Sequence, residues 1–370
     1  MKFMDILLAG YGNIGKAFMK LVEKHGCSHN ITICDLEYNN MDAIQYINEH
    51  HSEIDLFINL TGLRTKLFLD LVYKYNLAYV DAGIENDDAE MTSYDYYKSL
   101  LETKVNSKIL LGFGMNPGLV EHIYFKNLPS KRHYAIIFET DKATKGNEIF
   151  NTWSCESYYL EACVNDKFIS TPQNPYIVVD CPPIPFTVEN QKREYLLIPH
   201  EEVFSIQRLS PLCDASMFIY QAPVSIQEYL LHNKISENEA KQLKNQMDVS
   251  GTENVGILIY DDSDNLVYYH NTVSHEEIFK EFNTNATCWQ TACGVYLGME
   301  MIEIVEDGTI ATVSDLSIKY PDEIDKVLKK INFNIDTTEH YVSKEEFQQF
   351  IAQLQDKLEK SGHGNCLAKY

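Results

Sequence analysis

Short apolar runs alternate with amphipathic stretches along the first part of the chain. The apolar runs cover residues 3–9, 31–34, 56–60, 78–80 and 109–113. Helical periodicity occupies the intervals between them, for example residues 65–75 and 93–102. Strands that are separated by helical segments predict βαβ units and a parallel sheet. In such a sheet, ligands bind beyond the carboxyl ends of the strands.

The pattern changes after Asn116-Pro117-Gly118. From about residue 134 onward, the apolar runs are less regularly separated by helical segments; they cover residues 134–139, 176–180, 217–220, 255–260 and 266–269. The last two flank a polar turn at residues 261–265 and predict a hairpin. This region therefore predicts a mixed or antiparallel sheet, inserted after the fifth strand of the first domain.

Beyond Asn285 the pattern is helical again, with one long helix predicted over residues 286–304 despite two glycines. Ser343 and Glu346 have the spacing of a capping box and predict the start of a last helix. Its apolar positions, residues 347, 350, 351, 354 and 358, share one face. We expect this face to dock on the first domain.

A glycine-rich motif follows the first apolar run, with glycines at Gly10, Gly12 and Gly15. In a dinucleotide-binding fold, these glycines provide the tight turn, the close approach of a pyrophosphate and the packing of helix on strand, respectively. Free N–H groups at the start of the following helix, at Asn13 and Ile14, would then face the phosphates.

An acid ends the second apolar run, since Asp35 follows Gly15 by 20 residues. A carboxylate there can hydrogen-bond both ribose hydroxyls and would repel a 2′-phosphate, so NAD is favoured over NADP. Thr61, directly after the third run, is a further expected cofactor contact.

These patterns predict an α/β fold: a Rossmann doubly wound parallel sheet with an inserted α+β catalytic domain and C-terminal helices that return to the first domain. The expected boundaries are residues 1–125 for the NAD-binding domain, 126–285 for the substrate domain and 286–370 for the helical part that packs back on the first.

Composition narrows the classes of partner. The 370 residues carry a formal net charge of −23 at pH 7. This charge argues against nucleic acid and membrane as partners and favours cationic ones, although it also simply keeps a protein in solution. The nine cysteines are scattered without zinc-site spacing, so we expect no metal site. No long apolar stretch predicts a signal peptide or membrane span, so we expect a cytoplasmic protein with reduced thiols.

Several segments of the second region combine aromatic and polar residues. Trp153 lies in Asn-Thr-Trp-Ser, Glu161 follows eight residues later, and Glu139 ends a predicted strand. His200 precedes two glutamates and another predicted strand, and Asn116 follows the fifth apolar run, where a nicotinamide would lie. An aromatic face beside carboxylates suits an ammonium group. Each residue alone is typical of a structural role, but together they suggest a cationic substrate.

The same segments resemble those of homospermidine synthases in the saccharopine-dehydrogenase-like group. The matching motifs run in order along nearly the whole chain: Gly-Met-Asn-Pro-Gly at 114–118, Phe-Glu-Thr-Asp at 138–141, Asn-Thr-Trp-Ser at 151–154, His-Glu-Glu at 200–202, Val-Gly-Ile-Leu-Ile-Tyr at 255–260 and Asn-Ala-Thr at 285–287. The resemblance implies that NAD serves as a recycled hydride carrier. The implied enzyme oxidises putrescine to an imine, condenses it with a second diamine and reduces the product to homospermidine. Spermidine is a further candidate substrate, and we expect a homodimer.

The resemblance also implies roles for residues of this chain. Trp153 would stack on the substrate ammonium, Glu139, Glu161 and Glu85 would line the diamine channel, and Asn116 and His200 would border the reacting carbon. This chemistry needs a carboxylate or imidazole that takes a proton from the ammonium group. It also needs a closed site that protects the imine from water.

The chain departs from the pattern of these relatives in two places. Residues 164–175 form a reduced version of a Pro- and Gly-rich stretch, and Leu63 or Arg64 replaces an expected acid. An arginine would suit a carboxylate-bearing substrate, so a carboxyspermidine- or saccharopine-type dehydrogenase is the alternative. A non-catalytic NAD-binding protein is a third possibility, which requires a ruined site, whereas most motif residues are present.

Overall fold

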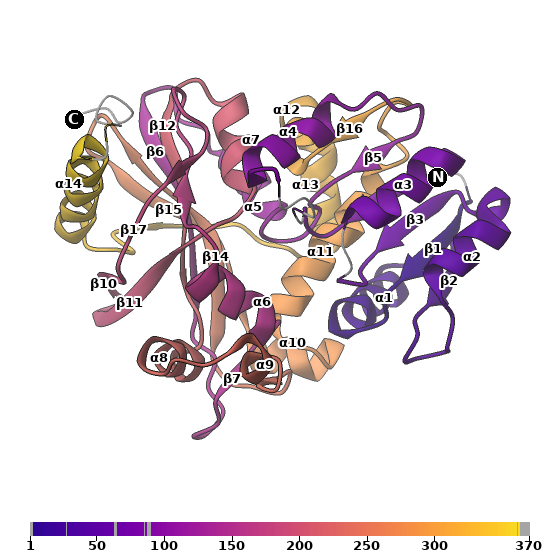
Figure 1. Cartoon of the computed structure of the whole chain (residues 1–370), viewed down its shortest axis with the longest axis horizontal. Helices are drawn as coiled ribbons and strands as arrows, with labels where there is room; N and C mark the ends of the chain where they lie inside the picture. Colours follow the sequence, from indigo (N-terminus) through magenta and orange to yellow (C-terminus); the bar gives the residue numbers. More distant parts are fainter. Residues whose placement is uncertain are drawn as a thin grey trace. The chain divides into compact units, whose positions relative to one another are not determined.

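The computed structural model describes residues 3–26, 28–62, 65–84, 86, 90–360 and 362. The chain forms two compact units, and each unit is made of two segments. The first unit comprises Met1–His122 and Cys288–Phe333, and the second comprises Ile123–Thr287 and Asn334–Tyr370 (Figure 1). Within the described ranges, no helix combines the length and the apolar character that a membrane crossing requires.

The first unit is built on a six-stranded parallel sheet with the strand order β16-β5-β4-β3-β1-β2. Its strands are β1 Asp5–Ala9, β2 Asn30–Cys34, β3 Leu56–Asn59, β4 Ala78–Asp81, β5 Ile109–Leu110 and β16 Ile310–Ala311. The helices that join or follow them are α1 Asn13–His25, α2 Ala43–His50, α3 Thr65–Tyr75, α4 Ser93–Glu102, α5 Leu119–Lys126, α11 Ala286–Met301, α12 Val313–Lys319 and α13 Pro321–Lys330. The predicted α/β class and Rossmann-type parallel sheet are confirmed.

Helix α11 covers most of the predicted range 286–304 and is buried on nearly all sides. A Cβ atom added at Gly294 would lie 2.0 Å from the carbonyl oxygen of Gly114. The glycine therefore allows the helix to pack directly on the turn that follows β5, which explains why it does not interrupt the helix.

The second unit is built on a seven-stranded mixed sheet with the order β10-β11-β12-β6-β14-β15-β17. Its strands are β6 His133–Asp141, β10 Ile184–Val188, β11 Gln191–Ile198, β12 Cys213–Gln221, β14 Thr252–Asp261, β15 Leu266–Ser274 and β17 Asp336–Glu339. Strands β12 and β6 are parallel, and β14 and β15 form the predicted hairpin. The predicted strand at 176–180 is shorter, because only β9 (Ile177–Val178) pairs, and it pairs with β8 (Phe168–Ile169) outside this sheet.

The remaining elements of the second unit are short except for its last helix. They are β7 Phe150–Asn151, α6 Cys155–Tyr159, a π-helical turn at Leu160–Val164, α7 Glu202–Leu209, α8 Val224–His232, α9 Glu237–Ala240, β13 Lys244–Asn245, α10 His275–Phe282 and α14 Lys344–Lys360. The segment after His200 is helix α7 and not the strand expected from the sequence. Its buried face, which includes Val203, Phe204 and Ile206, has the spacing of a helix.

The two faces of strand β6 carry different chemistry. Tyr134, Ile136 and Phe138 point into a hydrophobic core. Because side chains alternate along a strand, Glu139 and Asp141 point to the opposite face. The sheet therefore separates a large apolar core from the polar groups described below.

The last helix docks on the second unit, so the expectation that residues 286–370 all pack on the first domain is wrong. Its Phe347 and Phe350 lie 6.4 and 5.8 Å, ring to ring, from Phe186 of β10. Ser343 caps the helix by accepting the N–H of Glu346 at 3.4 Å. However, the Glu346 carboxylate accepts from the N–H and hydroxyl of Thr187, at 2.6 and 2.9 Å, and so ties the helix to β10.

Candidate functional site

The glycine-rich turn between β1 and α1 is closely packed at two positions and open at a third. Gly10 has φ +93°, and a Cβ there would lie 2.3 Å from the Leu60 carbonyl oxygen. A Cβ at Gly15 would lie 2.3 Å from the Gly10 carbonyl oxygen, whereas a Cβ at Gly12 would meet nothing within 4 Å. The turn therefore leaves open space at the position where a phosphate would approach the backbone.

Helix α1 starts at this open position with its N–H groups available. Gly12 is the N-cap, no side chain caps the helix, and the first turn holds no acidic residue. The N–H groups of the first turn, which includes Asn13 and Ile14, lack partners within the helix. An uncapped start of a 13-residue helix suits an anion, both by hydrogen bonding and through the helix dipole.

Asp35, at the end of β2, is held by three backbone groups. Its Oδ2 accepts from the N–H of Tyr11 at 2.8 Å, and its Oδ1 accepts from Glu37 and Tyr38 at 2.9 and 2.8 Å. The bond from Tyr11 is the main reason why the pKa of Asp35 is lowered, against a smaller opposing effect of burial. A carboxylate has about four acceptor positions. Asp35 therefore has room for one ribose hydroxyl as it stands, not for the two that the sequence suggested.

A cavity of about 350 Å³ lies beside this carboxylate. Its lining includes the acids Asp35, Glu37 and Asp42, and no lysine or arginine is among the described residues that line it. Thr61 also lines it and donates its hydroxyl to Asn59 Oδ1 at 2.8 Å. Such a cavity has the volume of a small-ligand site, and its acids oppose a 2′-phosphate.

We predict that the protein binds NAD at least tenfold more tightly than NADP. Asp35→Asn should weaken NAD binding about tenfold or more, because a hydrogen bond to a charged group is worth about 1.5–3 kcal/mol. The variant should also discriminate less between NAD and NADP. Dissociation constants from calorimetry would check this, with Asp70→Asn, an exposed acid of α3, as the control. Equal affinities for the two cofactors in the unmutated protein would contradict the prediction.

Three carboxyl groups gather on one face of the second unit's sheet. Glu139 and Asp141 come from β6, and Glu253 of β14 is the register partner of Asp141. Tyr220 of β12 is the register partner of Glu139. The exposed fractions of Glu139, Asp141 and Glu253 are 6%, 0% and 0%. We call this group the carboxylate cluster.

Hydrogen bonds determine which ring nitrogen of His275, the histidine beside this cluster, carries the proton. The N–H of Ala286 donates to His275 Nδ1 at 3.1 Å, so that nitrogen carries no proton. The ring proton is therefore on Nε2, which lies 3.2 Å from Asp141 Oδ1 and donates to it. Ligand atoms of Asp141, Glu253 and His275 lie within 4.8 Å of one another, a spacing that could hold a metal ion. A protonated Nε2 cannot ligate a metal, which favours a hydrogen-bonded network over a metal site.

Glu253 lies in surroundings that disfavour its charged form. Burial raises its pKa well above the ordinary value, and the nearby Asp141 and Glu139 carboxylates raise it further. Thr287 donates its hydroxyl to Oε2 at 2.9 Å, whereas Oε1 is buried without a hydrogen-bond partner among the described residues. A positive ligand at the cluster would lower the pKa of Glu253.

Trp153 lies next to the cluster with one edge fixed and part of its surface exposed. Its indole N–H donates to the hydroxyl of Tyr220 at 3.1 Å. Burial is the main reason why the pKa of Tyr220 is raised, and the charges of Glu139, Asp141 and Glu253 raise it further.

Two of the sequence motifs meet at the segment that carries Trp153. The Asn285 amide donates to the carbonyl oxygens of Thr152, at 2.5 Å, and Gln246, at 2.9 Å. The Thr152 hydroxyl donates to Asp141 Oδ2 at 2.5 Å. The residue before Trp153 is therefore held from both sides, by an amide and by a carboxylate of the cluster.

His200 forms a second charged group in the same unit. Its Nδ1 lies 2.6 Å from Glu202 Oε2. Burial lowers the pKa of His200, but Glu202, and then Glu161 and Glu201, outweigh it and raise the pKa to about 10. His200 is therefore an imidazolium at neutral pH, and the charge of Glu161 contributes to this.

A chain of rings links His200 to Tyr220. The His200 ring lies 5.2 Å from that of Phe218, which lies 6.0 Å from that of Tyr220. The structure thus brings Trp153, Glu139, Glu161 and His200 into one region. Asn116 belongs to the first unit, in the turn after β5, and Glu85 lies outside the described residues.

The sequence assigned no role to four residues of this region, namely Asp141, Tyr220, Glu253 and His275. Asp141 is two positions after Glu139, so the strand period alone could have placed both on one face. Glu253 and Tyr220 join them through pairing between strands that are distant in sequence. A charged residue that opens a long apolar strand, as Glu253 does, was the available signal.

The fold is shared with a solved dehydrogenase structure, although no family model and no curated protein sequence matches the chain. Saccharopine dehydrogenase (L-Glu forming) from Saccharomyces cerevisiae matches with a TM-score of 0.61 and 9% identity, over 90% of this chain and 99% of that one. A meso-DAPDH mutant from Clostridium tetani matches with a TM-score of 0.44 and 16% identity, over 87% and 99%. Myo-inositol dehydrogenase from Corynebacterium glutamicum matches with a TM-score of 0.36 and 11% identity, over 90% and 95%. The first of these likenesses shows a saccharopine-dehydrogenase-like fold.

Proposed function

We propose that the protein is an NAD-dependent oxidoreductase of primary amines, and that it joins two molecules of putrescine into homospermidine. The observation that carries this proposal is the buried carboxylate cluster beside Trp153 and Tyr220. Buried carboxylates are costly unless they are paired with positive charge. Beside aromatic faces they suit an alkylammonium group, which gains both ion pairing and cation–π attraction.

The residues of the first unit fit the cofactor that this reaction needs. The open space at Gly12 and the N–H groups of Asn13 and Ile14 would hold the pyrophosphate, and Asp35 would take a ribose hydroxyl. When bound, NAD supplies a hydride acceptor that takes hydride from the amine-bearing carbon and later returns it to the condensed imine. Two molecules of putrescine then give one homospermidine and one ammonia, without net oxidation.

The residues of the second unit divide the binding and the proton transfers between them. Glu139, Asp141 and Glu161 would pair with the ammonium groups of the diamine, and Trp153 would stack on one of them. His200 is protonated at neutral pH, so it would serve as an acid and protonate the departing amine nitrogen. A carboxylate, for which Glu161 beside His200 is our candidate, would take the proton that must leave the ammonium before hydride transfer.

We predict turnover without accumulation of reduced nicotinamide. The purified protein, given putrescine and a catalytic amount of NAD, should release homospermidine and ammonia, which mass spectrometry and an ammonia assay would detect. The absorbance of reduced nicotinamide should stay constant throughout. Growth of this absorbance in proportion to turnover would identify a simple dehydrogenase and contradict the proposal.

The same assay separates the alternatives. A carboxyspermidine- or saccharopine-type enzyme would consume reduced nicotinamide in stoichiometric amounts when it is given an amine and an aldehyde-bearing acid. Arg64, which suggested such a substrate, lies outside the described residues. A non-catalytic NAD-binding protein would bind the cofactor and form no product.

A further inference from the structure

Asp141 and Glu253, two members of the carboxylate cluster, are register partners on neighbouring strands and have no exposed surface. One oxygen of each lies within 4.8 Å of the other. Two carboxylates that are this close and shielded from water repel each other, and such pairs hold one proton between them. The hydrogen-bond donors around each group indicate which of the two carries this proton.

Asp141 is surrounded by donors, as an ionised carboxylate requires. Its Oδ1 accepts from the N–H of Ala143 at 2.7 Å and from His275 Nε2 at 3.2 Å. Its Oδ2 accepts from the hydroxyl of Thr152 at 2.5 Å. A carboxyl group that accepts two or three such bonds has a strong preference for its charged form. Asp141 is therefore the anion of the pair.

Glu253 has the opposite surroundings. Its Oε2 accepts from the hydroxyl of Thr287 at 2.9 Å, whereas Oε1 is buried without a hydrogen-bond partner among the described residues. The causes that raise the pKa of Glu253 include, after burial and the charges of Asp141 and Glu139, a hydrogen bond between the Glu253 and Asp141 carboxyl groups. A hydrogen bond between two carboxyl groups requires a proton on one of them. Since Asp141 is the anion, Glu253 is the acid.

The side chains beside Glu253 come from every element that packs around it. They are Asp141 and Glu139 of β6, Tyr220 of β12, Val273 of β15, His275 of α10 and Thr287 of α11. The proton on His275 Nε2 is donated to Asp141, so these side chains direct no positive charge at Glu253. They favour its uncharged form until a cation arrives from outside the protein.

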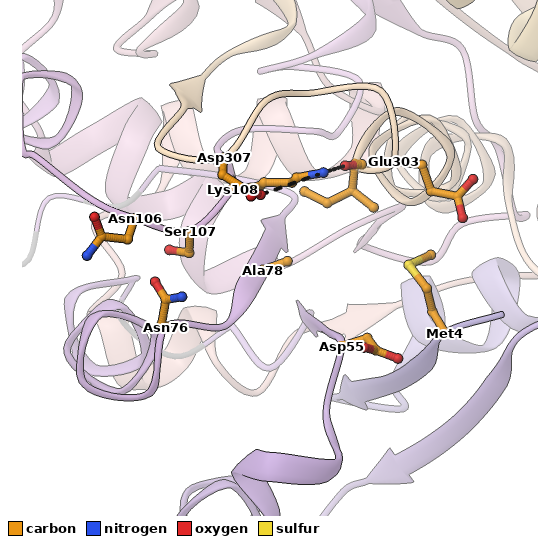
Figure 2. Close-up of a pocket in the computed structure, with 10 residues that line it drawn as sticks. Met4, Asp55, Asn76, Ala78, Asn106, Ser107, Lys108, Glu303 and Asp307 are labelled. Atoms are coloured by element: carbon orange, nitrogen blue, oxygen red, sulfur yellow. Dashed lines mark hydrogen bonds and ion pairs between the residues drawn. The ribbon is translucent and has the colours of Figure 1, made fainter. Parts of the chain in front are cut away.

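An acid on the surface has very different surroundings. Figure 2 shows a cavity of about 480 Å³ in the first unit, where the side chain of Asp307 is 83% exposed and Lys108 Nζ lies 4.0 Å from its carboxylate. Water and an ammonium group stabilise the charge of such an acid. Glu253 has no exposed surface, so its charged form depends on what binds at the cluster.

We propose that Asp141 and Glu253 hold one proton between them in the free protein, and that a cationic amine bound at Glu139 and Trp153 drives this proton out. Glu139 is 6% exposed, and is thus the member of the cluster that an ammonium group reaches first. The proton passes to water, no bond of the ligand changes, and two carboxylates then balance the new positive charge. The ligand class rests on the proposed function, whereas the shared proton does not.

The release of a proton gives amine binding a defined pH dependence. Because the free protein holds one more proton than the complex, the affinity should rise by about tenfold for each pH unit. This holds between the pKa of the pair in the complex and that in the free protein. The diamine stays doubly charged below about pH 8, because alkylamines titrate near the lysine value of about 10.4. The dependence therefore belongs to the protein.

The test is a calorimetric titration of the full chain with 1,4-diaminobutane, without NAD, in two buffers that differ in their enthalpy of ionisation. The difference between the two apparent enthalpies counts the protons released, and we expect one for each diamine bound at neutral pH. Glu253→Gln should release none. Glu277→Gln, a change at an exposed glutamate of α10, should release one. 1,4-Butanediol, which has the same length and no charge, should release none.

His200 is the other protonated group of this region, so the proton has to be assigned between the two. His200→Gln should still release one proton, in contrast to Glu253→Gln. Thr287→Val keeps the carboxyl pair and removes a donor that favours the charged form of Glu253. It should therefore move the pH dependence of diamine affinity to higher pH.

Infrared spectroscopy reports on the shared proton directly. The free protein should show the C=O stretch of a protonated carboxyl group, which lies apart from the carboxylate bands. This band should disappear when the diamine is added and should be absent from Glu253→Gln.

The outcomes separate this inference from the proposed function. Diamine binding without proton release overturns the inference, as does a release that persists in Glu253→Gln or is lost in His200→Gln. Proton release without any formation of homospermidine supports the inference and counts against the proposed function. Formation of homospermidine without proton release counts against the inference alone.

Discussion

Glu161→Gln is expected to raise the Michaelis constant for putrescine at least thirtyfold and to leave NAD affinity unchanged. The change keeps the shape of the side chain and removes its charge, so an ammonium group loses a partly desolvated partner. Such a loss costs about 2–5 kcal/mol, which corresponds to a factor of about thirty to several thousand. Steady-state kinetics with varied putrescine, together with a titration with NAD, would measure both quantities.

The same variant has a second readout, because the Glu161 charge helps to raise the pKa of His200. The alkaline limb of the pH–rate profile should therefore move to lower pH in Glu161→Gln. Glu345→Gln, a change at an exposed position in the first turn of α14, should alter neither the Michaelis constant nor the profile. Unchanged diamine kinetics in Glu161→Gln would remove this residue from the proposed channel.

The folded state is expected to lose stability as the pH rises from about 6.5 toward 10. His200 has a folded-state pKa of about 10 against an ordinary value of 6.5, so the folded protein binds one more proton than the unfolded chain in this window. The stabilisation is fully present below pH 6.5 and declines by about 1.4 kcal/mol for each pH unit above it. By pH 9 this single group should account for a loss of about 3 kcal/mol.

Urea unfolding at several pH values between 6.5 and 9 would check this, with the difference between the unmutated protein and His200→Gln as the measured quantity. The stability of the variant should depend much less on pH. His232→Gln, at an exposed position of α8, should retain the full dependence. Parallel pH curves for the unmutated protein and His200→Gln would show that the ion pair with Glu202 does not hold the proton.

Elements with a strong local pattern could be predicted from the sequence. The helical stretches at residues 65–75 and 93–102 have the bounds of α3 and α4, because periodicity, Thr92 as an N-cap and polar flanks all act locally. The hairpin of β14 and β15 followed from the polar turn between two apolar runs. The partner of α14 did not follow, because an apolar helix face indicates burial but does not identify the surface that buries it. The Glu346 carboxylate shows the same limit, since Thr187, 159 residues away in sequence, replaces its expected local partner.

The candidate site was predictable only where one motif held all of the information. The nucleotide-binding turn could be predicted from its three glycines alone, because their spacing does not depend on how distant strands pair. The carboxylate cluster, however, depends on the register of β6 with β14 and β12, which joins Asp141 to Glu253, 112 positions away, and Glu139 to Tyr220, 81 positions away. The tautomer of His275 is set by a single backbone N–H, that of Ala286. These relationships are properties of tertiary structure, and no local spacing encodes them.

The order in which the strands occur along the chain also affects how the protein folds during its synthesis. Each sheet receives its last strand late, because β16 joins the first sheet and β17 the second only after residue 300 has been made. Until then β5, at the edge of a parallel sheet, has no neighbour on its outer side. Exposed strand edges template aggregation, and a nascent chain grows by about 5–20 residues per second. The roughly two hundred residues between β5 and β16 thus leave this edge unpaired for about ten to forty seconds, a period in which a cotranslational chaperone would shield it.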